Sequence, residues 1–238
     1  MRFEERVEVR RIVPMGTILT WLVALTLLPV VFLWFDPYSA YVGPAVSDLP
    51  LLDSLMGLSR LLGKFEVQAV LILLVALGLW QLRPNRAASW LRVVSVTVGV
   101  EVLVVSLLKV LVRRPRPVIN AQAVGADGLL EEIATGRVLS FPSGDTAAAF
   151  AIACVAAAYF PRVRVTAMAA ACLVGFSRVY FGCHHFSDVV AGALIGTLIA
   201  GLILARTRPD RPLPEDRATP SGVPARIPAL SALLHLLE

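Results

Sequence analysis

Long apolar runs separated by short polar connections constrain the fold of this chain more than any other feature of its sequence. A bilayer core about 30 Å thick needs roughly 20 predominantly apolar residues per helix. Six segments approach this length: Ile12–Phe35, Glu66–Leu82, Leu91–Val112, Thr146–Phe160, Val165–Phe181 and Val189–Ala205. Charged residues make up only 16% of the chain, against about 25% in soluble domains. The sequence therefore predicts an all-α, polytopic membrane protein built as a bundle of six transmembrane helices.

The basic residues are distributed in a way that is typical of a topology signal. The formal net charge is +5, and arginines supply nearly all of the positive charge, mostly in the connections between apolar runs. Because Arg and Lys gather in cytoplasmic loops, this pattern favours a cytoplasmic N-terminus, and no nucleic-acid partner is predicted. Arg113, Arg114 and Arg116 are the exception, since they fall outside in this orientation; phosphate binding would explain them. Because these three arginines do not fit a cytoplasmic N-terminus, the inverted topology, with the N-terminus outside, stays an alternative.

Three regions are expected along the chain. Residues 1–11 are expected to form a cytoplasmic N-terminus, residues 12–205 the six-helix membrane domain, and residues 206–238 a cytoplasmic tail rich in proline and arginine. The first apolar run exceeds the ~7–15 residues of a signal-peptide core, so it is interpreted as a retained anchor. Apolar residues near the end of the tail recur at helical spacing, which suits either a short amphipathic helix on the membrane or a frayed end.

Lys109-x6-Arg116-Pro117 places basic side chains at the end of the third predicted helix. An ionisable residue within a span is costly and usually functional, although a lysine near a helix end can also extend its amine to the interface. The arginines that follow Lys109 make a simple interface anchor a poor explanation for the whole group. A planar guanidinium matches the oxygens of a phosphate, and the amine adds a point charge. We therefore expect Lys109 and Arg116 to bind a phosphoryl group.

Pro142-Ser143-Gly144-Asp145 immediately precedes the fourth predicted helix. The glycine permits a tight turn, and Ser143 offers a hydroxyl and a backbone N–H to an anion. The positive end of a helix dipole favours bound phosphate at such a place. The same residue types also suit an ordinary helix N-cap, so this motif alone is weak evidence.

Ser177-Arg178-x5-His184-x3-Asp188 is the most specific pattern in the chain. His184 and Asp188 are four residues apart, so on a helix their side chains share one face. A carboxylate bonded to one imidazole nitrogen orients the ring, leaves the other nitrogen free to attack and stabilises the positive charge that develops. Arg178 is expected at the same membrane surface. A metal site is disfavoured, because His184 and His185 are adjacent and no cysteine or acidic cluster completes a ligand set.

Together these patterns resemble the signature of the type 2 phosphatidic acid phosphatase (PAP2) family, K-x6-RP, PSGH and SR-x5-H-x3-D, over roughly residues 60–205. The first and third patterns are complete, and the second departs at its last position. The resemblance implies a PAP2-like helical bundle and a lipid phosphatase, a hydrolase that needs no metal ion or other cofactor. It also implies that His184 attacks phosphorus to form a phosphohistidine, with Asp188 as its partner. The residues that would stabilise the phosphoryl oxygens are Lys109, Arg116, Ser143, Gly144 and Arg178.

The departure lies at Asp145, which stands where the family has a histidine that protonates the leaving alkoxide. At neutral pH an aspartate among cations normally holds no proton to give. Three interpretations follow. The leaving group needs little help, as with a lipid diphosphate such as a polyprenyl diphosphate; or His185, or a buried and protonated Asp145, supplies the proton; or the protein only binds lipid phosphates.

The predicted function is hydrolysis of a lipid phosphate or diphosphate whose tail stays in the bilayer, in a bacterial inner membrane with the site on the outer side. A lipid phosphotransferase that uses the same phosphohistidine and a non-catalytic lipid-phosphate binding protein are the alternatives. A channel or transporter would not explain charged residues at one membrane face, although Glu101 is a candidate buried partner for a basic side chain. The loops Asp36–Phe65 and Val118–Ser140, which we expect to select the lipid, carry no recognisable pattern. The sequence predicts neither the lipid nor the oligomeric state.

Overall fold

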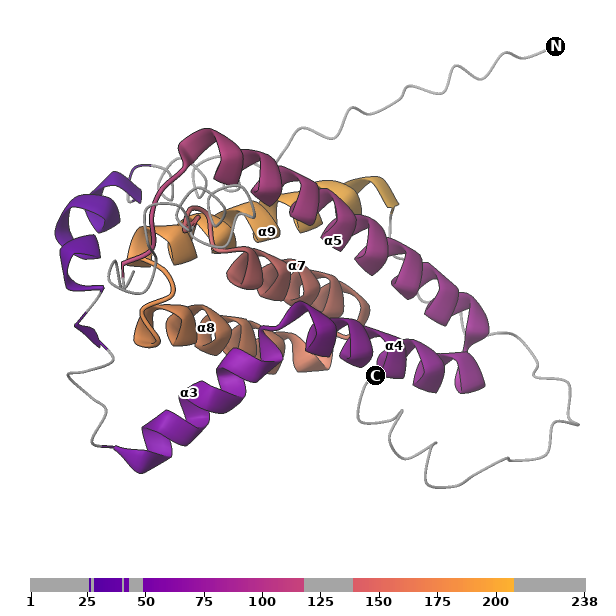
Figure 1. The fold of residues 1–238 in the computed structure, drawn as a ribbon. Coiled ribbons are helices and arrows are strands. Elements are labelled where there is room, and N and C mark those ends of the chain that lie inside the picture. Colours follow the sequence, from indigo (N-terminus) through magenta and orange to yellow (C-terminus); the bar gives the residue numbers. More distant parts are fainter. Residues whose placement is uncertain (1–25, 27, 40, 43–48, 118–138, 208–238) are drawn as a thin grey trace, which may run out of the picture.

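The computed structural model describes residues 26, 28–39, 41–42, 49–117 and 139–207. Within these ranges the chain is helical, apart from turns and one isolated bridge between Pro115 and Leu139. A helical stretch over residues 28–34 is followed, in the order shown in Figure 1, by η1 (Asp36–Tyr38), α3 (Pro50–Leu62), α4 (Phe65–Leu82), α5 (Pro84–Val112), α7 (Gly144–Tyr159), η2 (Pro161–Val163), α8 (Arg164–Tyr180) and α9 (Phe186–Thr207).

Four segments of the described chain are long and apolar enough to cross a membrane: α4, α5, the segment Pro161–Tyr180 and α9. α7 is a shorter apolar helix of 16 residues. The prediction of an all-α membrane protein is confirmed. Most of the first predicted run lies outside the described residues, as do the predicted N-terminus, residues 1–11, and the tail from residue 208 onward, so the number of six spans stays a prediction.

Most predicted segments agree closely with the helices, with two exceptions. α5 begins at Pro84 instead of Leu91, because hydropathy marks the bilayer and not the start of the helix. A proline in the first helical turn costs no hydrogen bond and has a φ that suits the helix. α3 occupies part of the segment that was expected to be a loop. It has 13 residues, which is too short for a span, so its apolar residues gave no membrane signal.

α7 lies between α5, α8 and α9 and contacts all three (Figure 1). Its alanines are mostly buried, as expected where small residues let helices approach closely in lipid. The approach of α9 requires glycine: a Cβ on Gly192 would come within 2.5 Å of the Ser143 carbonyl oxygen, and one on Gly196 would overlap the carbonyl of Ala147. This contact fixes the N-terminus of α7 against the start of α9.

The end of α5 is joined to the segment that precedes α7. Arg113 adopts a left-handed conformation with φ of 51°, and its N–H donates to the Lys109 carbonyl at 3.0 Å. Such a residue ends a helix, and the proline that follows two positions later cannot continue it. The Ser140 N–H then donates to the Arg114 carbonyl at 2.7 Å, beside the bridge between Pro115 and Leu139. The first and second motifs therefore lie at the same end of the bundle.

Candidate active site

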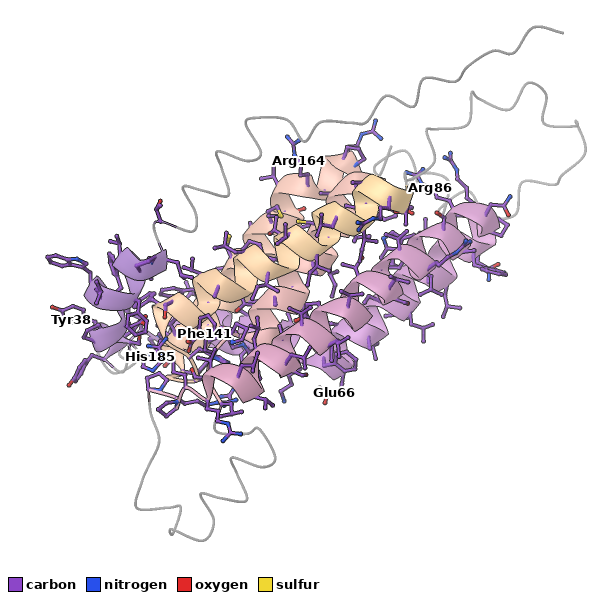
Figure 2. All side chains as sticks on the ribbon, turned by 90° about the horizontal axis from the view of Figure 1, so that it is seen from above. Tyr38, Glu66, Arg86, Phe141, Arg164 and His185 are labelled. Atoms are coloured by element: carbon purple, nitrogen blue, oxygen red, sulfur yellow. The ribbon has the colours of Figure 1, made fainter. Side chains whose placement is uncertain are left out.

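The three sequence motifs meet at one end of the bundle. Figure 2 shows Phe141 and His185 at this end, near Tyr38, whereas Arg86 and Arg164 lie at the opposite end. A cavity of about 270 Å³ is present among the motifs. Its walls carry five of the predicted site residues, namely Lys109, Arg116, Gly144, Asp145 and His184. The structure thus brings together residues of all three motifs.

His184 lies in the turn between α8 and α9, so the expectation that a helix carries it together with Asp188 is corrected. Its N–H donates to the Arg178 carbonyl at 3.2 Å, and the residue is only 3% exposed. Its Nδ1 lies 3.6 Å from Oδ2 of Asp188, in the first turn of α9. Because Nδ1 faces the carboxylate, Nε2 is the nitrogen left for an attack.

Asp188 is fully buried and its carboxylate is held from several directions. Oδ2 accepts hydrogen bonds from the Ser140 hydroxyl and, at 2.8 Å, from the His185 N–H. Oδ1 accepts a hydrogen bond from the Arg114 guanidinium, also at 2.8 Å. A carboxylate fixed in this way fixes the imidazole beside it. Ser140 was missed by the sequence analysis, because it lies outside the recognised motifs, two residues before Pro142.

Arg114 links Asp188 to the N-terminal part of the chain. The same guanidinium contacts Oδ2 of Asp36 at 2.7 Å and donates to the Ser187 hydroxyl at 2.6 Å. Asp36 in turn accepts a hydrogen bond from the Ser187 N–H at 2.8 Å. Asp36, Arg114, Ser187 and Asp188 therefore form one largely buried network behind the imidazole. No spacing in the sequence pointed to Asp36, which comes from a segment far from the motifs along the chain.

The three arginines after α5, whose position the sequence analysis attributed to phosphate binding, have different surroundings in the structure. Arg114 pairs with carboxylates, and Arg113 is at the surface with its Nε donating to the Val110 carbonyl at 3.0 Å. Arg116 alone of the three lines the cavity, and its buried Nε has no hydrogen-bond partner within the described residues. Lys109 also lines the cavity, and its amine donates to the Leu139 carbonyl at 3.0 Å.

Arg178 and Asp145 form an ion pair at the cavity. NH1 of Arg178 lies 3.1 Å from Oδ2 of Asp145, and NH2 donates to the Arg60 carbonyl at 2.7 Å. Arg178 is buried, whereas the Asp145 side chain is 37% exposed. Asp145 is thus placed as a hydrogen-bond acceptor and a partner of Arg178.

The second motif presents Gly144 to the cavity, but not the polar atoms of Ser143. The Ser143 N–H donates to the Asp188 carbonyl at 3.0 Å, and its hydroxyl shares a hydrogen bond of 2.8 Å with the hydroxyl of Thr146. Ser143 is fully buried. The N–H is thus engaged by α9 and the hydroxyl by Thr146 of α7, and the contact of Ser143 with an anion stays a prediction.

Burial lowers the pKa of the His184 imidazole below its ordinary value, and the Asp188 carboxylate only partly opposes this effect. Burial therefore favours the neutral form of the imidazole. The His185 side chain does not line the cavity, and its buried Nδ1 has no partner within the described ranges. In the part of the chain that the structure describes, no group of three or more His, Cys, Asp or Glu side chains is placed to hold a metal ion.

A comparison with known families agrees with this geometry. The profile of the PAP2 superfamily matches residues 90–212. The chain belongs to the PAP2 superfamily. Among curated relatives, the lipid A 1-phosphatase of Rhizobium johnstonii is 40% identical over 70 residues, which cover 28% of this chain and 29% of that protein. The decaprenylphosphoryl-5-phosphoribose phosphatase of Mycobacterium tuberculosis is 34% identical over 138 residues, covering 56% of this chain and 68% of that protein.

Two solved structures share the fold. The crystal structure of Aquifex aeolicus LpxE matches with a TM-score of 0.54 and 28% identity, over 72% of this chain and 94% of that chain. A transmembrane PAP2 type phosphatidylglycerolphosphate phosphatase from Bacillus subtilis matches with a TM-score of 0.60 over 82% of this chain and 98% of that chain, but at 21% identity it supports the fold alone. The match to the Rhizobium relative spans less than a third of that protein's length.

Proposed function

We propose that this PAP2 protein is an integral membrane phosphatase that hydrolyses a lipid phosphate or diphosphate through a phosphohistidine at His184. The observation that carries the proposal is the buried pair of His184 and Asp188, whose imidazole lines a cavity walled by Lys109 and Arg116. A neutral imidazole oriented by a carboxylate and facing two cations suits nucleophilic attack on an anionic phosphoryl group.

In the first step, Nε2 of His184 attacks phosphorus and the bond to the lipid oxygen breaks, with its electron pair leaving on that oxygen. The charge that develops on the imidazole is stabilised by Asp188. Lys109, Arg116 and the N-terminal N–H groups of α7 at Gly144 stabilise the equatorial oxygens. Water then attacks the phosphohistidine, which releases inorganic phosphate and restores the neutral imidazole.

In this proposal Arg178 and Ser143 do not contact the phosphoryl group. They position the residues that line the cavity or lie behind it. Arg178 holds Asp145 and accepts the His184 N–H on its carbonyl, while the Ser143 N–H holds the Asp188 backbone. Asp145 is engaged as a partner of Arg178, and the His185 side chain is outside the cavity wall. The leaving oxygen therefore departs with little help from an acid, and turnover depends strongly on how good a leaving group the substrate carries.

An apolar groove beside the cavity supports a lipid substrate. It has a volume of about 500 Å³ and is lined by α4, α5 and α7, with Leu71, Val75, Trp90 and Phe160 among its walls. Gln68 lines both the groove and the polar cavity, so the two are adjacent. A phosphoryl group in the cavity can therefore be joined to a hydrocarbon tail in the groove.

Gly78→Leu is expected to raise KM for a long-chain lipid phosphate about 10-fold. The leucine side chain would displace roughly two methylenes of the lipid tail from the groove, and burial of each methylene contributes ~0.8 kcal/mol to binding. Gly78 lines the groove, and a Cβ at this position meets no atom within 4 Å, so the protein tolerates the change. Kinetics on lipid phosphates of long and short chain measure the effect. Gly57→Leu is the matched control, since Gly57 also has open space but lies on α3. An equal KM in the two variants would contradict the proposal that the lipid tail lies in the apolar groove.

We also propose six spans, with residues 1–11 and 206–238 on the cytoplasmic side and the site at the outer face of a bacterial inner membrane. Arg86 and Arg164 at the end of the bundle opposite the site support this orientation (Figure 2), because basic residues favour the cytoplasmic side.

Phosphate release by the purified protein in detergent tests the proposed function. Lipid monophosphates and diphosphates are offered in the presence of a chelator, with His184→Ala as the inactive control. We expect release from at least one lipid and none from the control. Transfer of the phosphoryl group to a second lipid would identify a phosphotransferase. Binding of both lipids without release would identify a lipid-phosphate binding protein.

Asp36→Asn is expected to lower kcat roughly 10-fold with little change in KM. The amide removes the charge that pairs with Arg114, so Asp188 and the imidazole lose a fixed orientation, while the cavity wall stays intact. Steady-state kinetics separate the two constants. Asp53→Asn is a matched control, because Asp53 accepts a hydrogen bond from Tyr180 and not from the network. A kcat equal to that of the unchanged protein rules out a positioning role for Asp36.

The pH dependence follows from the lowered pKa of His184. The protonated imidazole cannot attack, so kcat/KM should fall as the pH drops through this pKa, with a midpoint below the ordinary ~6.5. Asp188 raises the pKa, so Asp188→Asn should move the acid limb to still lower pH as well as slowing the reaction. A pH–rate profile in one detergent measures both effects. A midpoint above the ordinary histidine value is incompatible with a buried, neutral nucleophile.

A further inference from the structure

Gln68 is a polar residue of the cavity wall that the chemistry described above does not use. It lies near the start of α4, a helix long and apolar enough to span the membrane, and it is 6% exposed. Its side-chain oxygen has no hydrogen-bond partner within the described residues. A buried amide oxygen without a partner is costly, and polar residues within spans are usually functional. This combination points to a polar ligand for the amide.

The charged groups of the cavity are engaged with one another. Asp145 pairs with Arg178 at 3.1 Å. Glu101, which the sequence analysis named as a candidate partner for a basic residue, interacts electrostatically with Lys109. Gln68 is uncharged, so it suits a neutral ligand such as water better than the phosphoryl oxygens, which the cations bind.

The position of Gln68 relates it to one particular step of the reaction. Attacking and leaving atoms lie roughly in line at a transferring phosphoryl group. With Nε2 of His184 on one side of phosphorus and the lipid tail in the groove, the leaving oxygen is on the groove side. The water that later attacks the phosphohistidine must approach along the same line, from the side that the lipid oxygen has left. That side is the junction of cavity and groove, and among the described residues Gln68 alone lines both.

This second step needs orientation of the water more than it needs a base. As the water oxygen bonds to phosphorus, the bond from phosphorus to Nε2 breaks and its electron pair returns to the imidazole. Both hydrogens of the water can stay on the product, which leaves as dihydrogen phosphate, so no side chain has to take up a proton. An amide oxygen accepts a hydrogen bond from water, and the last torsion of a glutamine lets either end of its amide face the cavity. A glutamine orients the attacking water in GTP-hydrolysing proteins as well.

We infer that the side chain of Gln68 orients the water that hydrolyses the phosphohistidine at His184. This inference rests on the proposed function and deepens it, because it assigns a residue to the second step. The cations act in both steps, whereas the amide is needed only after the lipid alcohol has left. Loss of the amide should therefore slow the breakdown of the intermediate and leave its formation unchanged.

Transient kinetics of Gln68→Met test this assignment. Methionine keeps the length of the side chain and removes its strong hydrogen-bonding groups. A long-chain para-alkylphenyl phosphate labelled with radioactive phosphorus combines a tail with a good leaving group, so that the intermediate forms fast. Rapid quenching gives the rate at which the label forms, and a chase with unlabelled ester gives the rate at which it decays. We expect decay to be about 10- to 100-fold slower in the variant, with formation unchanged.

Steady-state constants and matched variants supply independent readouts. Slower breakdown should lower kcat and KM together and preserve kcat/KM, which reports the steps up to release of the alkylphenol. Gln68→Glu keeps an acceptor oxygen, so its label should decay faster than that of Gln68→Met. Gln81→Met makes the same exchange at the far end of α4, where the residue is exposed, and its label should decay as in the unchanged protein.

The possible failures are distinguishable. If the label decays at the unchanged rate in Gln68→Met, or if formation and decay slow alike, Gln68 does not orient the water, although the phosphohistidine stands. Absence of any label in the unchanged protein would overturn the proposed function and this inference with it. Gln68→Leu repeats the test as a second apolar variant should the methionine variant fail to fold, and normal label formation shows that a variant is folded.

Discussion

His184→Ala should lower kcat for lipid phosphate hydrolysis by about 10⁴-fold or more, because the residual rate of an enzyme without its nucleophile comes from binding and charge stabilisation alone. His184 is the imidazole that lines the cavity and has Asp188 behind it. Phosphate release under saturating lipid measures the loss. Lipid binding should persist, since Lys109 and Arg116 are unchanged.

His185→Ala is the matched control for this prediction. The neighbouring histidine contributes its backbone N–H to Asp188, which the substitution keeps, while its side chain is outside the cavity wall. We expect this variant to retain most of the activity. A loss as large as that of His184→Ala would instead make His185 the proton donor that the sequence analysis considered. Full activity of the His184→Ala variant would exclude His184 as the nucleophile.

The second large effect concerns the leaving group. A missing general acid costs about 10²–10⁴ in rate for an alkoxide and little for a leaving group that is already stable as an anion. Because Asp145 is paired with Arg178 at 3.1 Å, we expect the protein to hydrolyse an aryl phosphate faster than an alkyl phosphate by a ratio in that range. The kcat values for a short series of phosphate esters give this ratio.

Asp145→His should narrow the ratio by raising the rate on the alkyl phosphate, since an imidazole can hold a proton near neutral pH. Asp145→Asn should leave the ratio unchanged, because neither side chain donates a proton as an acid. A small ratio in the unchanged protein, widened by Asp145→Asn, would show that Asp145 does supply the proton. The variants therefore separate the interpretations that the sequence left open.

The parts of the fold that depend on short-range patterns could be predicted from the sequence. Hydropathy located α4, α7, α8 and α9 because each is a continuous run of apolar residues. It missed α3, which is too short to span, and it missed the start of α5 at Pro84 because the helix continues beyond the apolar residues.

In the candidate site, too, short-range motifs could be predicted from the sequence and tertiary contacts could not. Lys109, Arg116 and His184 line the cavity because their motifs are compact and lie at helix ends. The network behind Asp188 could not be predicted, since Asp36 reaches Arg114 and Ser187 only through tertiary packing. Ser143 illustrates the converse: its motif suggested an anion contact, but in the structure its N–H donates to the Asp188 carbonyl and its hydroxyl bonds to Thr146.

Trapping the covalent intermediate tests the central claim most directly. Protein mixed with a lipid carrying radioactive phosphate and quenched within the first turnover should carry an acid-labile, base-stable label on His184. The label should be absent from His184→Ala and should form more slowly in Asp188→Asn. A label on another residue, or phosphate release without any covalent label in the unchanged protein, would contradict the account.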